Sequence, residues 1–157
     1  MRFISQKLKA NIFINILGIR KIPLLLFCRP KVIEINDQKV IIKIPLKRRT
    51  RNHVNSMYIG ALVVGADISS GYLAFHHLGK TNKKISLIFK DFHADFLRRA
   101  EGDVHFVCND GDKIKLLIDE VIATQKRCNM TVNVNAFVPG KFNNESVAIF
   151  KLTLSIK

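Results

Sequence analysis

A run of nineteen residues, 57–75, contains a single charged side chain, Asp67. The run is apolar on every face of a helix, so we expect one long helix that the rest of the chain buries. Its length is nearly enough to cross a bilayer, but Asp67 near the middle opposes insertion. A carboxylate in such surroundings loses its hydration and has to be paired, protonated or used in chemistry. The question of what the chain does is therefore largely a question about Asp67.

Segments typical of β-strands lie on both sides of this helix. Ser56 is its expected N-cap and Gly79 its expected end. Residues 112–123 place apolar side chains at helical spacing and predict a surface helix between the later strands. The whole pattern predicts an α+β fold in which one antiparallel sheet wraps round the long helix. The expected strands are 32–35, 40–44, 85–97, 104–108, 131–137 and 147–156, and a turn at Asn36 and Asp37 joins the first two.

Small residues recur along the predicted helix and allow a sheet to approach it closely. A single curved sheet leaves an edge strand exposed, and pairing that edge with a second copy would cover it. A homodimer or a dimer of dimers is therefore the expected assembly.

The formal net charge of the 157-residue chain is +14. Such a charge attracts phosphates, nucleic acid and anionic lipid without choosing among them. Aromatic residues are not regularly interleaved with the basic ones, so no specific nucleic acid is expected. Three widely spaced cysteines fit neither a disulfide framework nor a zinc site, and the histidines lack metal-ligand spacing. We expect a cytoplasmic protein without a metal.

The N-terminal segment is basic and partly apolar, and no signal-peptide cleavage site follows it. Apolar residues at near-helical spacing predict a helical extension over residues 1–28, followed by the domain over residues 29–157. We prefer an interpretation in which the apolar stripe packs on the domain or on a dimer mate, and a helix at a membrane surface is the alternative. The stripe consists of Phe3, Ile4, Leu8, Ile12, Phe13, Ile16 and Leu17.

The segment that leads into the long helix reads Arg-Asn-His-Val-Asn-Ser-Met-Tyr-Ile-Gly-Ala over residues 51–61, and Asp67 follows. It resembles the hotdog-fold acyl-CoA thioesterases of the phenylacetyl-CoA thioesterase-like group, whose motif is Asn, a short loop, His-Gly-Gly and then Asp or Glu on the central helix. Residues 89–104, which end in Gly-Asp-Val, resemble a strand and corner of the same group. The chain is more similar to a poorly characterised branch with an N-terminal helix and an extra helix before the final strands, and the resemblance covers nearly its whole length.

The resemblance implies hydrolysis of an acyl-CoA or acyl-carrier thioester, with no cofactor beyond the coenzyme A of the substrate. Asp67 would be the general base or the nucleophile, and Asn52 would orient the attacking water or the substrate. The backbone N–H of Ile59 would donate to the thioester oxygen at the helix N-terminus, and Gly60 would leave room for the substrate. The family's His-Gly is Tyr58-Ile59 here, so Tyr58 either donates to the substrate or packs, and packing is favoured.

Basic residues add a rival interpretation. Unless a bulge intervenes, Lys90 points at the helix from the expected strand and pairs with Asp67. This pair would lower the pKa of Asp67, which suits a nucleophile but weakens a base. It would equally fit a non-catalytic acyl-CoA-binding protein with a structural ion pair. The arginines expected to meet coenzyme A phosphates are Arg98 and Arg99, with Arg48, Arg49 and Arg51 as further candidates.

Overall fold

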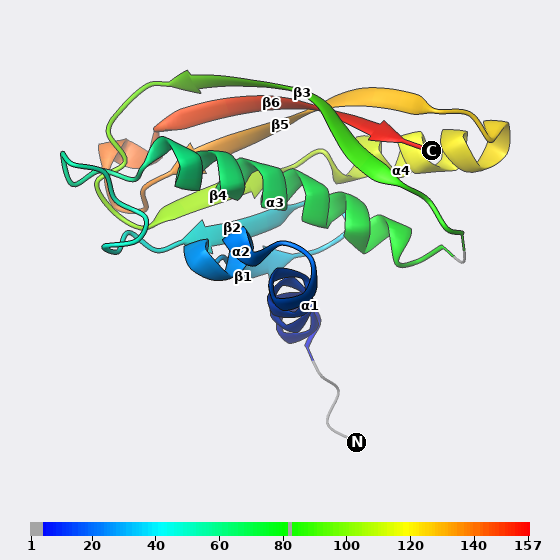
Figure 1. Ribbon diagram of the computed structural model, residues 1–157. Coiled ribbons are helices and arrows are strands. Elements are labelled where there is room, and N and C mark those ends of the chain that lie inside the picture. The colour runs from blue at the N-terminus through cyan, green and yellow to red at the C-terminus, as the bar shows by residue number, and fades with distance from the viewer. Residues whose placement is uncertain (1–4, 82) are drawn as a thin grey trace.

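One antiparallel sheet curves round a long helix in the computed structural model, which describes residues 5–81 and 83–157 (Figure 1). This arrangement confirms the predicted α+β fold. The elements follow the chain in the order α1 (Gln6–Arg20), α2 (Pro23–Cys28), β1 (Lys31–Ile35), β2 (Val40–Ile44), α3 (Ile59–Leu78), β3 (Leu87–Phe96), β4 (Val104–Cys108), α4 (Gly111–Thr124), β5 (Cys128–Phe137), the short 3-10 helix η1 (Phe142–Asn144) and β6 (Ala148–Ile156).

The sheet has the strand order β1-β2-β4-β5-β6-β3, and all neighbouring strands are antiparallel. The ten-residue strand β3 pairs only with β6, so one side of its backbone is an open edge within the described chain. Its side chains Phe92 and Phe96 are exposed. Long open edges are sites of association, and this edge also exposes the charged residues Lys90, Asp91 and Asp95.

The predicted turn between β1 and β2 is built by Asn36, whose side-chain oxygen accepts the N–H groups of Gln38 and Lys39, each at 2.9 Å. The turn is tied to the end of α3, because His77 Nε2 lies 2.8 Å from the carbonyl oxygen of Asp37. Lys80 and His76 also contact the Asp37 carboxylate and hold its pKa at about 2.

The central helix α3 starts at Ile59, two residues later than predicted, and its N-cap is Tyr58 instead of Ser56. It lies very close to the sheet. A Cβ atom on Gly65 would stand 2.2 Å from the ring of Phe106 on β4, so only glycine fits this crossing. Of the described helices, α3 alone is long and apolar enough to cross a membrane, and most of it is buried in the core.

The predicted surface helix is present as α4, with Ile114, Leu117, Ile118 and Val121 on its buried face. The N-terminal stripe packs on the domain only in part, through Leu17 and through the Phe13 ring, which lies 5.7 Å from the Tyr72 ring, and its contact with a dimer mate stays a prediction. Of its described members Leu8, Ile12, Phe13 and Ile16 are exposed, and the residues that α1 buries are Ala10, Ile14 and Gly18. Phe3 and Ile4 lie outside the described residues. The side chain of Asn11 fastens α1 to the sheet by accepting the Val32 N–H at 2.9 Å.

Candidate active site

The loop before α3 is organised by the side chain of Asn52. Its Oδ1 atom accepts the N–H groups of Val54 and Ser56, both at 3.0 Å. The N–H of Met57 donates to the carbonyl oxygen of Ala100 at 2.8 Å and joins the loop to the segment after β3. Because the Asn52 oxygen is engaged within the loop, the group of Asn52 that lacks a partner among residues 5–81 and 83–157, and could meet a ligand, is Nδ2.

A surface pocket of about 430 Å³ opens at the N-terminus of α3. Asn52, Ile59, Arg98 and Arg99 all line it, so the structure brings together four of the residues that the sequence singled out. Among the described residues, no acceptor receives the N–H of Ile59 or of Gly60. Free N–H groups at a helix N-terminus favour developing negative charge.

Ser56 also lines this pocket, and sequence reasoning assigned it a different role. The residue is only 4% exposed, and its hydroxyl has no hydrogen-bond partner among the described residues. A buried hydroxyl without a partner is costly, so a native one is explained best by a ligand or water that the pocket takes up. A serine three residues before a helix looks like an N-cap in sequence, and only the geometry shows that its hydroxyl is unused.

Tyr58 occupies the space that Gly60 provides. Its ring lies 2.9 Å from where a Gly60 Cβ would stand, while the residue as a whole stays 55% exposed. The glycine therefore accommodates the tyrosine ring, which packs over the first turn of α3.

Asp67 lies in a separate cavity of about 190 Å³, lined by Leu17 and Ile22 at the N-terminal helices and by Leu87 and Phe89 on β3. Within residues 5–81 and 83–157 its carboxylate forms no ion pair and accepts no hydrogen bond. Burial raises the pKa of Asp67 above its usual range. A carboxylate in this state is a better proton acceptor near neutral pH than a cation-paired one.

The expected pair between Lys90 and Asp67 is not formed, and the lowered pKa expected from it is wrong. Strand β3 contains a bulge, in which Lys90 and Asp91 together lie opposite Thr153 of β6. The extra residue breaks the alternation, so Phe89 and Phe92 both register with buried residues of β6 while Lys90 is exposed.

Asp67 and the α3 N-terminus are too far apart to act on one group within a chain. Asp67 lies eight residues after Ile59 in the same helix. At the helical rise this separates them by about 12 Å, several times the size of a thioester group. One chain thus contains two separate candidate half-sites. The first has the free donors at the start of α3, and the second has the carboxylate of Asp67.

The arginines of the first half-site differ in their contacts. Arg98 pairs with Glu145 and lies 5.6 Å from the centre of the Phe142 ring, so its direction is fixed. Arg99 is exposed and has no acidic partner in the described part of the chain. No cluster of three or more possible metal ligands occurs among the described residues.

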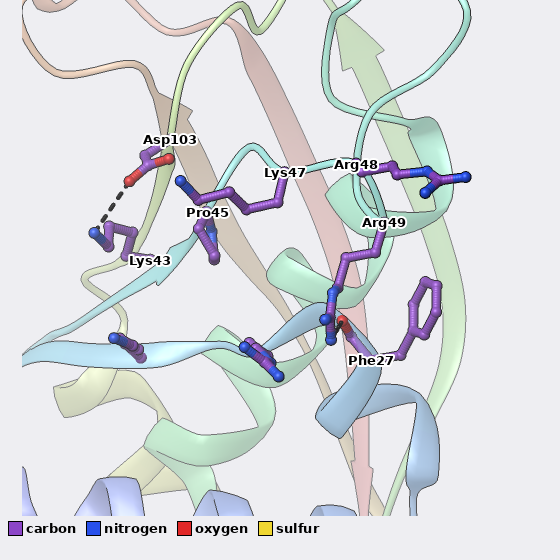
Figure 2. Close-up of a pocket in the computed structure, with 9 residues that line it drawn as sticks. Phe27, Lys43, Pro45, Lys47, Arg48, Arg49 and Asp103 are labelled. Atoms are coloured by element: carbon purple, nitrogen blue, oxygen red, sulfur yellow. Dashed lines mark hydrogen bonds and ion pairs between the residues drawn. The ribbon is translucent and has the colours of Figure 1, made fainter.

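A further pocket, of about 900 Å³, lies beside β2 and is strongly basic (Figure 2). Lys43 pairs with Asp103 at 3.1 Å and Lys47 extends toward them, whereas Arg48 points away. Arg49 lies over the ring of Phe27 at 5.8 Å. Cations outnumber the single acid here, which suits a phosphate-bearing ligand. The cations that line it are Arg29, Lys31, Lys43, Lys47, Arg48 and Arg49.

A family model described as a domain of unknown function, DUF4442, matches residues 11–147. This chain belongs to the DUF4442 family. No curated protein matches it.

Solved structures share the fold of this DUF4442 protein at low sequence identity. A protein of unknown function from Chlorobaculum tepidum TLS has a TM-score of 0.81 at 10% identity, over 94% of each chain. A probable thioesterase from Pseudomonas aeruginosa has a TM-score of 0.73 at 21% identity, over 93% of this chain and 94% of its own. A thioesterase from Haemophilus influenzae has a TM-score of 0.65 at 12% identity, over 91% and 88%. The neighbours thus include thioesterases and establish the hotdog fold, while the phenylacetyl-CoA thioesterase-like branch remains a prediction.

Proposed function

We propose that this DUF4442 protein hydrolyses an acyl thioester, carried by coenzyme A or by an acyl carrier, in a site completed by two copies of the chain. The observation that carries the proposal is the set of unused donors at the start of α3. The Ser56 hydroxyl and the N–H groups of Ile59 and Gly60 have no partners among the described residues and lie in one region. Hydrolysis of a thioester needs such donors for the oxyanion of its tetrahedral intermediate.

Asp67 supplies the second requirement, a base. It accepts a proton from water while the water oxygen attacks the thioester carbonyl carbon, and the carbonyl oxygen becomes an oxyanion that the N–H of Ile59 stabilises. Collapse of this intermediate breaks the carbon–sulfur bond, and the thiolate takes up the proton, leaving a carboxylic acid and a free thiol. The raised pKa and the absence of a cationic partner in the described residues favour the general-base role over the nucleophilic one.

A dimer formed through β3 would join the two half-sites. Strand β3 begins beside the Asp67 cavity, which Leu87 and Phe89 line, and ends beside the α3 pocket, which Phe96 lines. Antiparallel pairing of two β3 edges about a twofold axis places the start of one strand against the end of the other. Asp67 of one copy then faces Asn52, Ser56 and Ile59 of the other, and the dimer has two such sites. The exposed side chains Phe92 and Phe96 supply apolar contact.

The positive groups near this site support a carrier with negative charge. Arg98 and Arg99 border the pocket in which the thioester would lie, and the basic pocket beside β2 shares the loop that carries Asn52. Phosphates of coenzyme A, or the phosphopantetheine of a carrier, match these cations. Cytoplasmic location belongs to the same proposal, because both carriers occur there.

The test is release of free thiol from acyl-CoA thioesters of increasing chain length. We expect turnover with at least one chain length, a loss of about tenfold or more in kcat for Asp67→Asn and Ser56→Ala, and no change for Asp119→Asn, which removes an exposed carboxylate on α4. Turnover that Asp67→Asn leaves unchanged would refute the chemistry. Thermal stabilisation by acyl-CoA without turnover would instead establish the binding protein, an alternative that no longer has the Asp67–Lys90 pair in its favour.

A further inference from the structure

The two N-terminal helices expose much apolar surface that the fold does not use. In Figure 1 both lie beneath α3, and α1 lies at the periphery of the molecule. Nine large apolar side chains between Gln6 and Cys28 are exposed, and Ile19 is the most exposed at 68%. They are Leu8, Ile12, Phe13, Ile16, Ile19, Ile22, Leu24, Leu26 and Phe27.

The exposed residues of α1 form one continuous stripe. Leu8, Ile12, Ile16 and Ile19 follow one another at spacings of four, four and three residues, which places them on a single helix face. The residues that hold α1 on the domain, Ala10, Ile14 and Gly18, lie two residues out of step and therefore on the opposite face. Packing within the described chain thus explains the apolar residues on one face of α1. It leaves the apolar residues on the opposite face exposed.

The charges around this surface indicate which kind of partner covers it. From Gln6 to Ile33 the chain has no Asp or Glu. Two copies meeting through this surface would bring only positive charges together, which opposes self-association. An anionic lipid surface attracts each such side chain by about 1 kcal/mol. The basic residues of the segment are Lys7, Lys9, Arg20, Lys21, Arg29 and Lys31.

The surface continues into the basic pocket. Phe27, at the end of α2, is exposed and lies under Arg49, while Arg29 and Lys31 line the same pocket (Figure 2). An aromatic ring bordered by arginines suits the level of lipid headgroups, where the ring is buried and the cations meet phosphate.

We propose that α1 and α2 form a docking surface for an anionic lipid bilayer. The exposed stripe lies in the plane of the membrane interface, the flanking lysines and arginines contact lipid phosphates, and the domain remains above the surface. At 15 residues α1 is too short to span a bilayer, so the contact is peripheral. This inference does not depend on the hydrolytic reaction.

The experiment is co-flotation of the full chain with vesicles of phosphatidylcholine alone and of phosphatidylcholine mixed with phosphatidylglycerol. We expect binding to the mixed vesicles, weak binding to the neutral ones and release at high salt. The double variant Ile16→Ser, Ile19→Ser is expected to lower the partition coefficient about tenfold or more, because it removes two apolar side chains from the interface. Leu116→Ser is the matched control, since this α4 residue is 69% exposed but lies outside the surface.

Folding of each variant is checked by circular dichroism, and the exposure of Ile16 and Ile19 makes loss of the fold unexpected. A chain that floats with neither vesicle, or a double variant that binds as the native chain does, would overturn the proposal. So would a double variant whose mass by light scattering falls to that of a smaller assembly, because a second copy would then cover the stripe.

Discussion

Replacing Gly65 by alanine tests the closest approach between helix and sheet. The added Cβ would stand 2.2 Å from two ring atoms of Phe106, whereas carbon atoms in contact are about 3.5–4.0 Å apart. The ring is completely buried and packs near Phe150, with 6.3 Å between ring centres, so it cannot turn away into solvent. One of the two elements has to move by more than about 1 Å.

Overpacking of this kind costs about 1–3 kcal/mol, and the overlap at Gly65 places it at the upper end. Alanine also favours the helix over glycine by about 1 kcal/mol, which offsets part of the cost. We therefore expect Gly65→Ala to lower the free energy of unfolding by about 2 kcal/mol, or the midpoint of thermal unfolding by roughly 4–8 °C for a chain of this size.

Gly71 on the same helix is the control, since a Cβ there would be 3.6 Å from the Phe89 ring, an ordinary contact. Gly71→Ala should stabilise the fold by about 0.5–1 kcal/mol. Urea unfolding followed by far-UV circular dichroism measures both variants. A Gly65→Ala variant as stable as the native chain would contradict this expected loss. Adding Phe106→Leu to Gly65→Ala should cost less than the sum of the single changes, because the smaller side chain makes room for the new methyl group.

Three further predictions concern ionisable groups. The raised pKa of Asp67 means that its contribution to stability is present below pH about 4 and lost as pH rises, so Asp67→Asn should raise the free energy of unfolding at neutral pH, and the gain should vanish in acid. Burial lowers the pKa of His77, so its contribution is present above pH about 6.5 and lost as pH falls, and His77→Gln should flatten this acid limb of the stability curve. Lys90→Ala should change stability by less than about 0.5 kcal/mol, because the side chain is exposed. If Lys90→Ala instead lowered the free energy of unfolding by about 3 kcal/mol, the result would support a buried ion pair between Lys90 and Asp67.

Much of this fold was predictable because each main element has a strong local pattern. The apolar run round Asp67 predicted α3, the spacing over residues 112–123 predicted α4, and Asn36 marked the first hairpin. These signals depend on neighbours along the chain, so they can be recognised without knowledge of the tertiary structure.

The errors arose where a single residue changes the register or the face of an element. The bulge in β3 turns the Lys90 side chain away from the helix, and no residue type in that strand indicates a bulge in the sequence. Helix α1 has apolar residues on two opposite faces, so periodicity alone could not tell which face meets the domain. The unused hydroxyl of Ser56 results from a helix start two residues later than its sequence suggests.

Mixing two inactive variants tests whether the half-sites come from different chains. Asn52→Ala removes a residue of the donor half-site and Asp67→Asn removes the carboxylate, and about 12 Å of helix separates the two regions. If each site takes one half from each copy, a mixed dimer contains one site with both changes and one with neither. Random assembly makes half of the dimers mixed, so after joint unfolding and refolding the mixture should regain about a quarter of native turnover. Two inactive variants whose mixture stays inactive would place the whole site in one chain, whereas single variants that retain full turnover would reject Asp67 and Asn52 as catalytic residues.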